Sequence, residues 1–226
     1  MGDYTYAVFK DYLLLRFGRD TAFSSPTDYY GIWINSAYRR LCASDRLYPI
    51  NKLYIFPELE TDVAVTTTEG TGYVPTPSDC QIVRRLYHNT DKAKLKWMSF
   101  GQYVGYTDRA TSTSRAAPTQ WHRRGTNILL HPTPDNSTDS LQIFYKKRPV
   151  ALSGTNVTVL GAEWDEPILE LAHHIGKTWL NEWDVAEKSK KALIEMEADL
   201  ISAMGAEEKD RQEIWRADPA YTEPSY

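Results

Sequence analysis

The stretch NILLHPTPDNSTDSLQIFYKKRP, residues 127–149, decides the fold of this chain. Apolar and polar residues alternate in NILLH and again in SLQIFYKK, which predicts two β-strands. In the second strand we expect Leu141, Ile143 and Tyr145 on one face, and Gln142 and Phe144 on the other. The segment PTPDNSTD between them is rich in turn residues, so the stretch predicts a β-hairpin. Such a hairpin serves to grip nucleic acid, to line an active site, or to hold neighbouring proteins in place.

Similar short alternating segments surround the hairpin and predict further strands. They are residues 53–60, 62–68, 81–89, 94–100 and 156–160. Residues 105–120, GYTDRATSTSRAAPTQ, have no periodicity, and we expect a long mobile loop there. Together these segments predict a small antiparallel β-domain over residues 47–161.

Helical periodicity is confined to the two ends of the chain. At the N-terminal end, the first helix is expected over residues 4–18, with Gly18 as its stop. A second is expected to begin with Ser25 as N-cap, Pro26 at the first helical position and Asp28 in the first turn. Their apolar faces are Phe9, Tyr12, Leu13 and Phe17 in the first helix, and Tyr30, Trp33, Ile34, Ala37 and Leu41 in the second.

Two more helices are expected near the C-terminal end. One opens near Asp165, and the other begins after the NEWD turn with Asp184 and Glu187 as a capping pair and ends at Gly205. Their apolar faces are Ile168, Leu171, Ala172, Ile175 and Trp179, then Leu193, Met196, Leu200 and Met204. Residues 205–226 are charged and contain two prolines, which predicts an extended tail.

A pair of short amphipathic helices does not bury its apolar faces alone, so the four helices are expected to pack as one bundle. The sequence thus predicts an α+β fold with four parts. They are residues 1–46 (N-terminal helices of the bundle), 47–161 (inserted β-domain), 162–204 (C-terminal helices of the bundle) and 205–226 (extended tail).

Composition narrows the classes of protein. Hydrophobic residues make up 42% of the 226 and charged residues 25%, as in ordinary globular domains. We expect no membrane-spanning helix, because no run of 18 apolar residues exists, and no signal peptide. The two cysteines, Cys42 and Cys80, have no metal-binding spacing and are expected to be reduced thiols.

Charge is distributed unevenly along the chain. Residues 47–161 carry thirteen basic and nine acidic side chains, whereas residues 162–226 carry seven and sixteen. The basic residues include three clusters, Arg84 and Arg85, Arg123 and Arg124, and Lys146, Lys147 and Arg148. A net charge of −4 does not favour tight DNA binding, so these clusters are interpreted as contacts between subunits, weak contacts with phosphate, or charges that protect strand edges.

The sequence predicts no enzyme and no cofactor. It contains no G-x-S-x-G, P-loop or G-x-G-x-x-G motif. Glu170 and His173 form one Glu-x-x-His pair, but a di-metal carboxylate site requires a second such pair and further carboxylates. His174 is adjacent to His173 and therefore points to another face of the helix. We therefore expect no metal site and interpret both histidines as capping or interface residues.

Several segments together resemble the head-to-tail adaptor (connector) proteins of tailed bacteriophages. The resemblance is carried by WINSAYRRL, FPELETDVAVTTTEGTGYVPTPSDCQIVRRLY and WHRRGTNILLHPTPDNSTDSLQIFYKKRPVAL, followed by the two C-terminal helices. It covers about residues 25–204 and includes W-x-N-x-A-Y-R, a P-x-D step at Pro77-Ser78-Asp79, and an h-x-h-x-Y-x-x-x-P strand that ends at Pro149.

The resemblance implies a virion protein without catalytic residues, located at the neck beneath the portal and made in the cytoplasm of a bacterial host. It implies a homo-oligomeric ring, a dodecamer, which binds the portal protein and a tail or nozzle protein and surrounds the double-stranded DNA of the exit channel. The C-terminal segment of such proteins docks on the portal, and the matching residues here are 205–226, with Trp215, Tyr221 and Tyr226 as anchors. Two rival hypotheses are a virion-associated cell-wall hydrolase and a receptor- or glycan-binding tail component.

Overall fold

The structure is a computed structural model that describes residues 2–18, 20–24, 27–43, 46–51, 54–109 and 115–216, with the backbone alone for residues 21, 24, 107–109 and 204–216. The chain divides into two compact units. The helical unit comprises Met1–Phe56 and Pro149–Tyr226, and the β-unit comprises Pro57–Arg148. The β-unit is smaller than the predicted insertion of residues 47–161, because the flanking segments pack with the helices. For example, the rings of Tyr54 and Phe56 both contact Trp164, at 5.0 and 4.9 Å between ring centroids.

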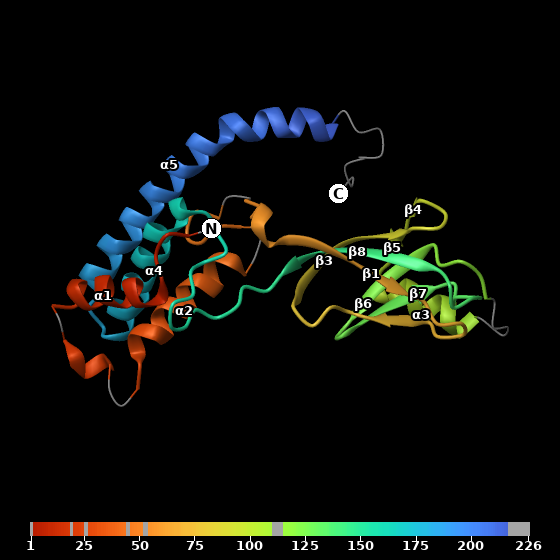
Figure 1. Cartoon of the computed structure of the whole chain (residues 1–226), viewed down its shortest axis with the longest axis horizontal. Coiled ribbons are helices and arrows are strands. Elements are labelled where there is room, and N and C mark those ends of the chain that lie inside the picture. The colour runs from red at the N-terminus through yellow and green to blue at the C-terminus, as the bar shows by residue number, and fades with distance from the viewer. Residues whose placement is uncertain are drawn as a thin grey trace. The chain divides into compact units, whose positions relative to one another are not determined.

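Four α-helices build the helical unit (Figure 1). They are α1 (Tyr6–Arg16), α2 (Tyr29–Cys42), α4 (Asp165–Trp179) and α5 (Trp183–Arg216), with short 3₁₀ turns η1 (Thr21–Ser24) and η3 (Ala162–Trp164). Helix α4 packs between α2 and α5, and α1 lies against α2 and α4. The predicted apolar stripe of α2 is buried completely, which confirms that face. The fold is α+β, as predicted.

A carboxylate joins the first two helices. Asp28 is the N-cap of α2 and accepts a hydrogen bond from the Gly31 amide at 3.0 Å. It also accepts one from the Tyr6 hydroxyl at 2.7 Å and pairs with the Lys10 ammonium at 3.0 Å, both from α1. Burial alone raises the pKa of Asp28, but the hydrogen bonds from Tyr6 and the Gly31 amide outweigh it and lower the pKa. The predicted N-cap residue, Ser25, lies outside the described residues with Pro26, and the cap is three residues later than predicted.

A glycine lets α4 approach the aromatic residues of the other helices. An added Cβ at Gly176 lies 2.6 Å from the Phe17 ring and 2.8 Å from the Trp33 ring, which is too close for any side chain. Phe17 and Trp33 themselves stack at 5.1 Å. Trp179, which was expected on the buried face of α4, is 55% exposed, yet its ring contacts Tyr29 at 5.1 Å.

Helix α5 begins at Trp183 and is far longer than predicted. It continues through Gly205 to Arg216, so the first half of the predicted extended tail is helical. One glycine costs a helix only about 1 kcal/mol, and the following residues AEEKDRQE have high helix propensity, so the helix continues through it. Residues 217–226 lie outside the described residues.

The β-unit contains two four-stranded sheets. The first has the order β1-β8-β3-β4 and the second β2-β7-β6-β5. The strands are β1 (Glu60–Thr66), β2 (Tyr73–Pro75), β3 (Cys80–His88), β4 (Ala93–Lys94), β5 (Lys96–Trp97), β6 (Gln120–Arg124), β7 (Asn127–His131) and β8 (Ser140–Lys147). All paired strands are antiparallel except β5 and β6, which are parallel, so the predicted antiparallel domain is in fact mixed. One apolar core joins the two sheets, with Leu86, Leu141 and Ile143 from the first and Ile128 and Leu130 from the second.

The stretch of residues 127–149 forms two strands, but they do not pair as a hairpin. β7 pairs with β2 and β6, whereas β8 pairs with β1 and β3. The polar segment between them crosses from one sheet to the other. It hydrogen-bonds to residues 67–72, which connect β1 to β2 and cross between the same two sheets. For example, the Thr67 amide donates to the Asp139 carbonyl at 2.9 Å. The hairpin prediction is wrong because alternation shows which face is buried but not which strand is the partner. The predicted faces of β8 are confirmed.

A helix replaces part of the predicted mobile loop. Helix α3 (Phe100–Arg109) begins with a capping box, in which the Ser99 amide donates to the Gln102 side chain at 2.9 Å and the Gln102 amide donates to the Ser99 hydroxyl at 3.3 Å. Residues 110–114 of the loop lie outside the described residues. Two predicted strands are also wrong. Residues 53–60 include the 3₁₀ turn η2 (Pro57–Leu59), and residues 156–160 make only one isolated bridge, between Val157 and Thr5.

Candidate interaction surface

The motif W-x-N-x-A-Y-R on α2 fastens this helix to the segment that returns from the β-unit. The Asn35 side chain accepts a hydrogen bond from the Leu152 amide at 2.7 Å and donates one to the Leu152 carbonyl at 3.1 Å. One turn later, the Tyr38 hydroxyl accepts from the Val159 amide at 3.2 Å. These bonds satisfy backbone groups that have no strand partner, so the motif has a structural role.

The P-x-D step and the Y-x-x-x-P strand meet in the β-unit. The Tyr145 hydroxyl donates to the Asp79 carboxylate at 3.0 Å, and the Arg148 amide donates to the Asp79 carbonyl at 2.7 Å. Burial of the ring, followed by the hydrogen bond to Asp79, raises the pKa of Tyr145 to about 12. Asp79 therefore holds the start of β3 to the end of β8.

A β-bulge explains why two adjacent arginines in β3 lie on the outside of the first sheet. Val83 pairs with Tyr145 and Arg85 pairs with Phe144, so Arg84 is the extra residue of the bulged strand. The Arg84 guanidinium donates to the Glu60 carboxylate at 2.8 Å, while the Arg85 guanidinium lies 4.3 Å from the Phe144 ring centroid. The two neighbours thus have different partners, and only Arg84 is neutralised by a carboxylate.

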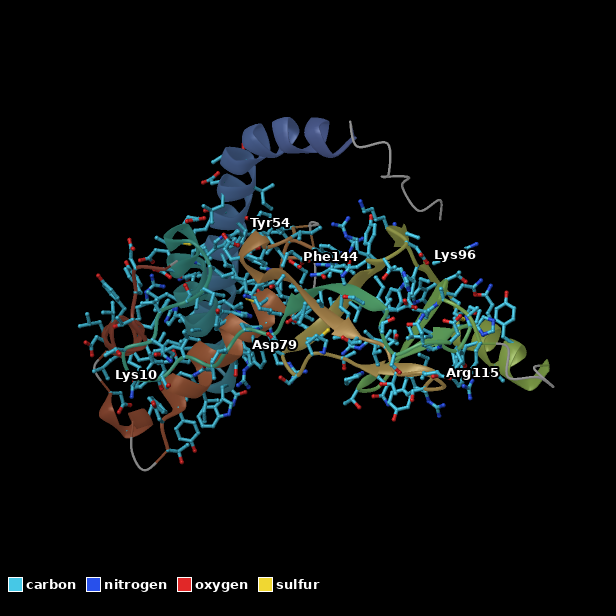
Figure 2. The ribbon with its side chains drawn as sticks, turned by 45° about the vertical axis from the view of Figure 1, so that its right-hand side comes forward. Lys10, Tyr54, Asp79, Lys96, Arg115 and Phe144 are labelled. Carbon is cyan, nitrogen blue, oxygen red and sulfur yellow. The ribbon has the colours of Figure 1, made fainter. Side chains whose placement is uncertain are left out.

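Arg85 lines a shallow groove of about 300 Å³ on this outer face. We name it the β3–β8 groove, and the residues that line it are Arg85, Tyr87, His88, Asn89, Lys92, Gln142 and Phe144. The side-chain amide of Asn89 donates to the Gln142 side chain at 3.3 Å and to the Ser140 hydroxyl at 3.0 Å, which fixes the floor of the groove. Figure 2 labels Phe144, which stands on β8.

Three carboxylates of this sheet and its turn lie against side chains other than Arg85 and Lys92. Glu60 pairs with Arg84, and Asp62 accepts a hydrogen bond from Gln142. Asp91 faces the buried ring of His88, 3.3 Å from its Nδ1. On the other side of this ring, Nε2 lies 3.1 Å from the Asp139 carboxylate, although the two atoms lack the alignment of a hydrogen bond.

Two cations of the groove are left without such a partner. Among the described residues, neither Arg85 nor Lys92 has a hydrogen-bond or ion-pair partner, and the contacts of Arg85 are with the rings of Phe144 and Tyr87. Lys94, the register partner of Tyr87 on the edge strand β4, is also exposed. The groove therefore combines positive charge with aromatic surface.

The other two basic clusters, Arg123 with Arg124 and Lys146 to Arg148, do not line the β3–β8 groove. Arg123 donates to the Gln81 carbonyl, and Arg124 lies 5.1 Å from the Phe100 ring centroid. Lys146 is fully buried on the inner strand β8, between Glu60 of β1 and Ile82 of β3, so the prediction that it serves as a surface contact is wrong. Lys147 is half-buried and Arg148 is exposed.

The histidines of α4 contact α5. His173 Nδ1 lies 2.7 Å from the Ser189 hydroxyl, and His174 Nδ1 lies 2.9 Å from the Ala186 carbonyl. The Glu170 carboxylate is engaged by Arg16 of α1. In the part of the chain that the structure describes, no group of three or more His, Cys, Asp or Glu is placed to hold a metal ion, and no helix is long and apolar enough to cross a membrane. Cys42 and Cys80 are buried thiols.

The three predicted anchors of the tail have no described side chains. Trp215 belongs to α5, of which the structure gives only the backbone at that position, and Tyr221 and Tyr226 lie outside the described residues.

The sequence had no signal for the groove itself. Tyr87, Asn89 and Lys92 lie in an ordinary strand and turn, and their convergence with Gln142 and Phe144 results from the pairing of β3 with β8.

In this protein the recognisable motifs hold together segments within each unit, and the exposed charged and aromatic side chains suit contact with other macromolecules. Comparison with known families assigns it more closely. Residues 4–221 match the family described as SU10 adaptor protein, and the chain belongs to that family. It is thus a structural adaptor protein of a bacteriophage and a component of the virion. No curated protein matches the sequence.

Proposed function

We propose that this adaptor is the head-to-tail connector of a tailed phage. In this proposal, copies of the chain form a closed ring, a dodecamer, beneath the portal protein at the capsid vertex. The ring joins the portal to a tail or nozzle protein and encloses the channel through which double-stranded DNA leaves. The subunits of a closed ring meet through two different surfaces, and the opposite charges of the β-unit and the C-terminal region suit such contacts.

The observation that carries the proposal is the length of α5. Helix α5 has 34 residues and its neighbour α4 has 15. At a rise of 1.5 Å per residue, they span about 51 and 22 Å. The two are joined by a short turn and run in opposite directions, so the second half of α5 continues beyond the end of α4, as Figure 1 shows. Residues 205–216 of this half and the following residues 217–226 together form the proposed docking arm. Its proposed anchors are Trp215, Tyr221 and Tyr226.

The test uses the portal protein of the same phage. The full chain is expected to bind immobilised portal, whereas a chain that ends at Met204 is expected to fold but not to bind. A second variant keeps the full length and replaces the three anchors, Trp215→Ala, Tyr221→Ala and Tyr226→Ala. Aromatic anchors often contribute about 2 kcal/mol or more each, so this variant should lose binding at least about thirtyfold. Undiminished binding by the shortened chain, which should still unfold cooperatively, would contradict the docking role.

A further inference from the structure

We infer that the β3–β8 groove binds residues 217–226 of a second copy of this chain. The inference rests on the proposed function only in identifying the occupant as part of the docking arm. When no portal is bound, the groove holds this segment, and portal docking has to displace it. The groove is therefore a contact between copies that regulates when the arm is available.

The first argument is the unpaired charge in the groove. Arg85 and Lys92 have no ion-pair partner among the described residues, although Glu60, Asp62 and Asp91 all lie on the same sheet or in its turn. Glu60 and Asp62 hold other side chains instead, and Asp91 lies beside the His88 ring, whose Nδ1 accepts the Asp91 backbone N–H. The β-unit as a whole carries twelve basic and nine acidic side chains, so the groove attracts an anionic partner.

The second argument is the geometry of Arg85. One face of its guanidinium covers the Phe144 ring at 4.3 Å from the centroid, with the Tyr87 centroid at 5.5 Å. Stacking on a ring holds the guanidinium plane and leaves its N–H groups at the edge free to donate. Carboxylates accept two such N–H groups at once, which makes them the preferred partner of an arginine held in this way.

The third argument is the chemistry of the proposed occupant. Residues 217–226, ADPAYTEPSY, carry two acidic side chains and no basic one. Asp218 and Glu223 flank Tyr221, so a short extended peptide presents a carboxylate, a ring and a second carboxylate. Pro219 and Pro224 oppose continuation of the helix and favour extended backbone, which fits a shallow groove on the face of a sheet. A nucleic acid also combines anions and rings, and the experiment treats it as a rival.

A mixing experiment tests both halves of the contact in the full chain. One variant loses the groove charges by Arg85→Glu and Lys92→Glu, and the other loses the segment charges by Asp218→Lys and Glu223→Lys. At low salt the wild-type chain is expected to self-associate in sedimentation experiments, and each variant alone is expected to remain monomeric. An equal mixture should form one-to-one complexes, because each variant still contributes the half that the other lacks. Variants that associate like the wild type would overturn the inference.

A peptide-binding measurement tests whether Arg85 makes the contact and whether residues 217–226 are the ligand. The host is the full chain with Asp218→Asn and Glu223→Gln, so that its own segment does not compete, and the probe is a fluorescent peptide of residues 217–226. Loss of one charge-assisted contact by Arg85→Gln should weaken binding about tenfold. The matched control is Arg124→Gln, because Arg124 also lies over a ring, that of Phe100, and should leave binding unchanged.

Three outcomes contradict the inference. Equal weakening by both arginine variants means that the peptide only senses net charge. Peptide binding without any self-association of the wild-type chain means that each copy holds its own segment. A single-stranded oligonucleotide that displaces the peptide and binds more tightly, in a manner that depends on Arg85, means that the groove takes nucleic acid. None of these measurements uses the portal, so their failure is distinguishable from failure of the docking role.

Discussion

The Tyr145 hydroxyl donates a hydrogen bond to the Asp79 carboxylate at 3.0 Å, and this bond joins two motifs that are 66 residues apart in the chain. Asp79 precedes β3, and Tyr145 lies near the end of β8 on the face that packs in the core. Because β3 and β8 are paired strands, this hydrogen bond holds together one end of their pairing. That end lies close to the boundary of the β-unit at Arg148. The two motifs thus meet through their Asp and Tyr residues.

Tyr145→Phe is expected to lower the free energy of unfolding by about 1 kcal/mol, because it removes the hydrogen bond that the buried Tyr145 donates to the exposed Asp79 carboxylate. Urea denaturation followed by tryptophan fluorescence measures the change. The control is Tyr73→Phe, which removes the hydroxyl of a tyrosine that is 48% exposed and should have almost no effect. Equal effects of the two substitutions would show that the bond to Asp79 contributes nothing.

Asn35→Ala is expected to destabilise the chain by about 2 kcal/mol, since it removes three hydrogen bonds and leaves the backbone N–H and C=O of Leu152 without their partners. Asn35→Asp retains the acceptor and loses the donor, so it should fall between the wild type and the alanine variant. Thermal unfolding measures both. Arg39→Ala, an exposed position on the same helix, serves as control and should change stability by less than about 0.5 kcal/mol.

Local patterns predicted the faces of the elements well. The stripe of Trp33, Ile34 and Ala37 on α2 is visible because a helix buries one residue in every three or four. The alternation of Leu141 and Ile143 in β8 is visible because a strand exposes every second side chain. Both patterns depend only on neighbours in the sequence, and therefore the sequence alone reveals them.

Partners distant in the sequence were not predictable in this way. Nothing in residues 127–149 distinguishes a hairpin from two strands in facing sheets, because both bury the same side chains. The groove shows the same limit, since the partner of Arg84 is Glu60, 24 residues away, and the ring under Arg85 is Phe144. Helix α3 was a different failure. Its capping residues Ser99 and Gln102 were readable, but glycines at positions 101 and 105 concealed the helix.

Arg16 and Glu170 form an ion pair between α1 and α4, in which the Glu170 side chain is almost fully buried. Burial alone raises the pKa of Glu170, but hydrogen bonds from His173 and Arg16 and the charge of Arg16 outweigh it and lower the pKa to about 2. Arg16→Met therefore leaves a buried carboxylate without its cation and should cost about 3 kcal/mol at pH 7. The double variant with Glu170→Gln should recover part of this loss.

The pH dependence of this pair has a defined direction. A carboxyl whose pKa is lower in the folded chain stabilises it above the ordinary pKa of 4.5, and this contribution disappears as the pH falls from 4.5 towards 2. The wild type should therefore lose stability over this range more steeply than the double variant. Urea denaturation at several pH values measures the difference, and identical slopes would argue against the ion pair.

Glu197 has the opposite behaviour. This residue of α5 is fully buried, and both of its carboxyl oxygens are without a hydrogen-bond partner in the part of the chain that the structure describes. Burial raises its pKa to about 8, and the backbone N–H of Ile50, which is near but does not meet hydrogen-bond geometry, offsets only part of this effect. The folded chain thus keeps the proton at pH 7, whereas the unfolded chain releases it above its ordinary pKa of 4.5.

The free energy of unfolding should therefore decrease as the pH rises from 4.5 to 8, by up to about 1.4 kcal/mol per pH unit from this residue, and level off above pH 8. Glu197→Gln keeps the shape and removes the titration, so it should flatten this decrease and leave the variant more stable than the wild type at pH 8. Glu195→Gln, an exposed position on the same helix, should retain the wild-type slope. Chemical denaturation at pH 5, 6.5 and 8 compares the three proteins. A slope that Glu197→Gln leaves unchanged would mean that this carboxyl reaches water in the folded chain.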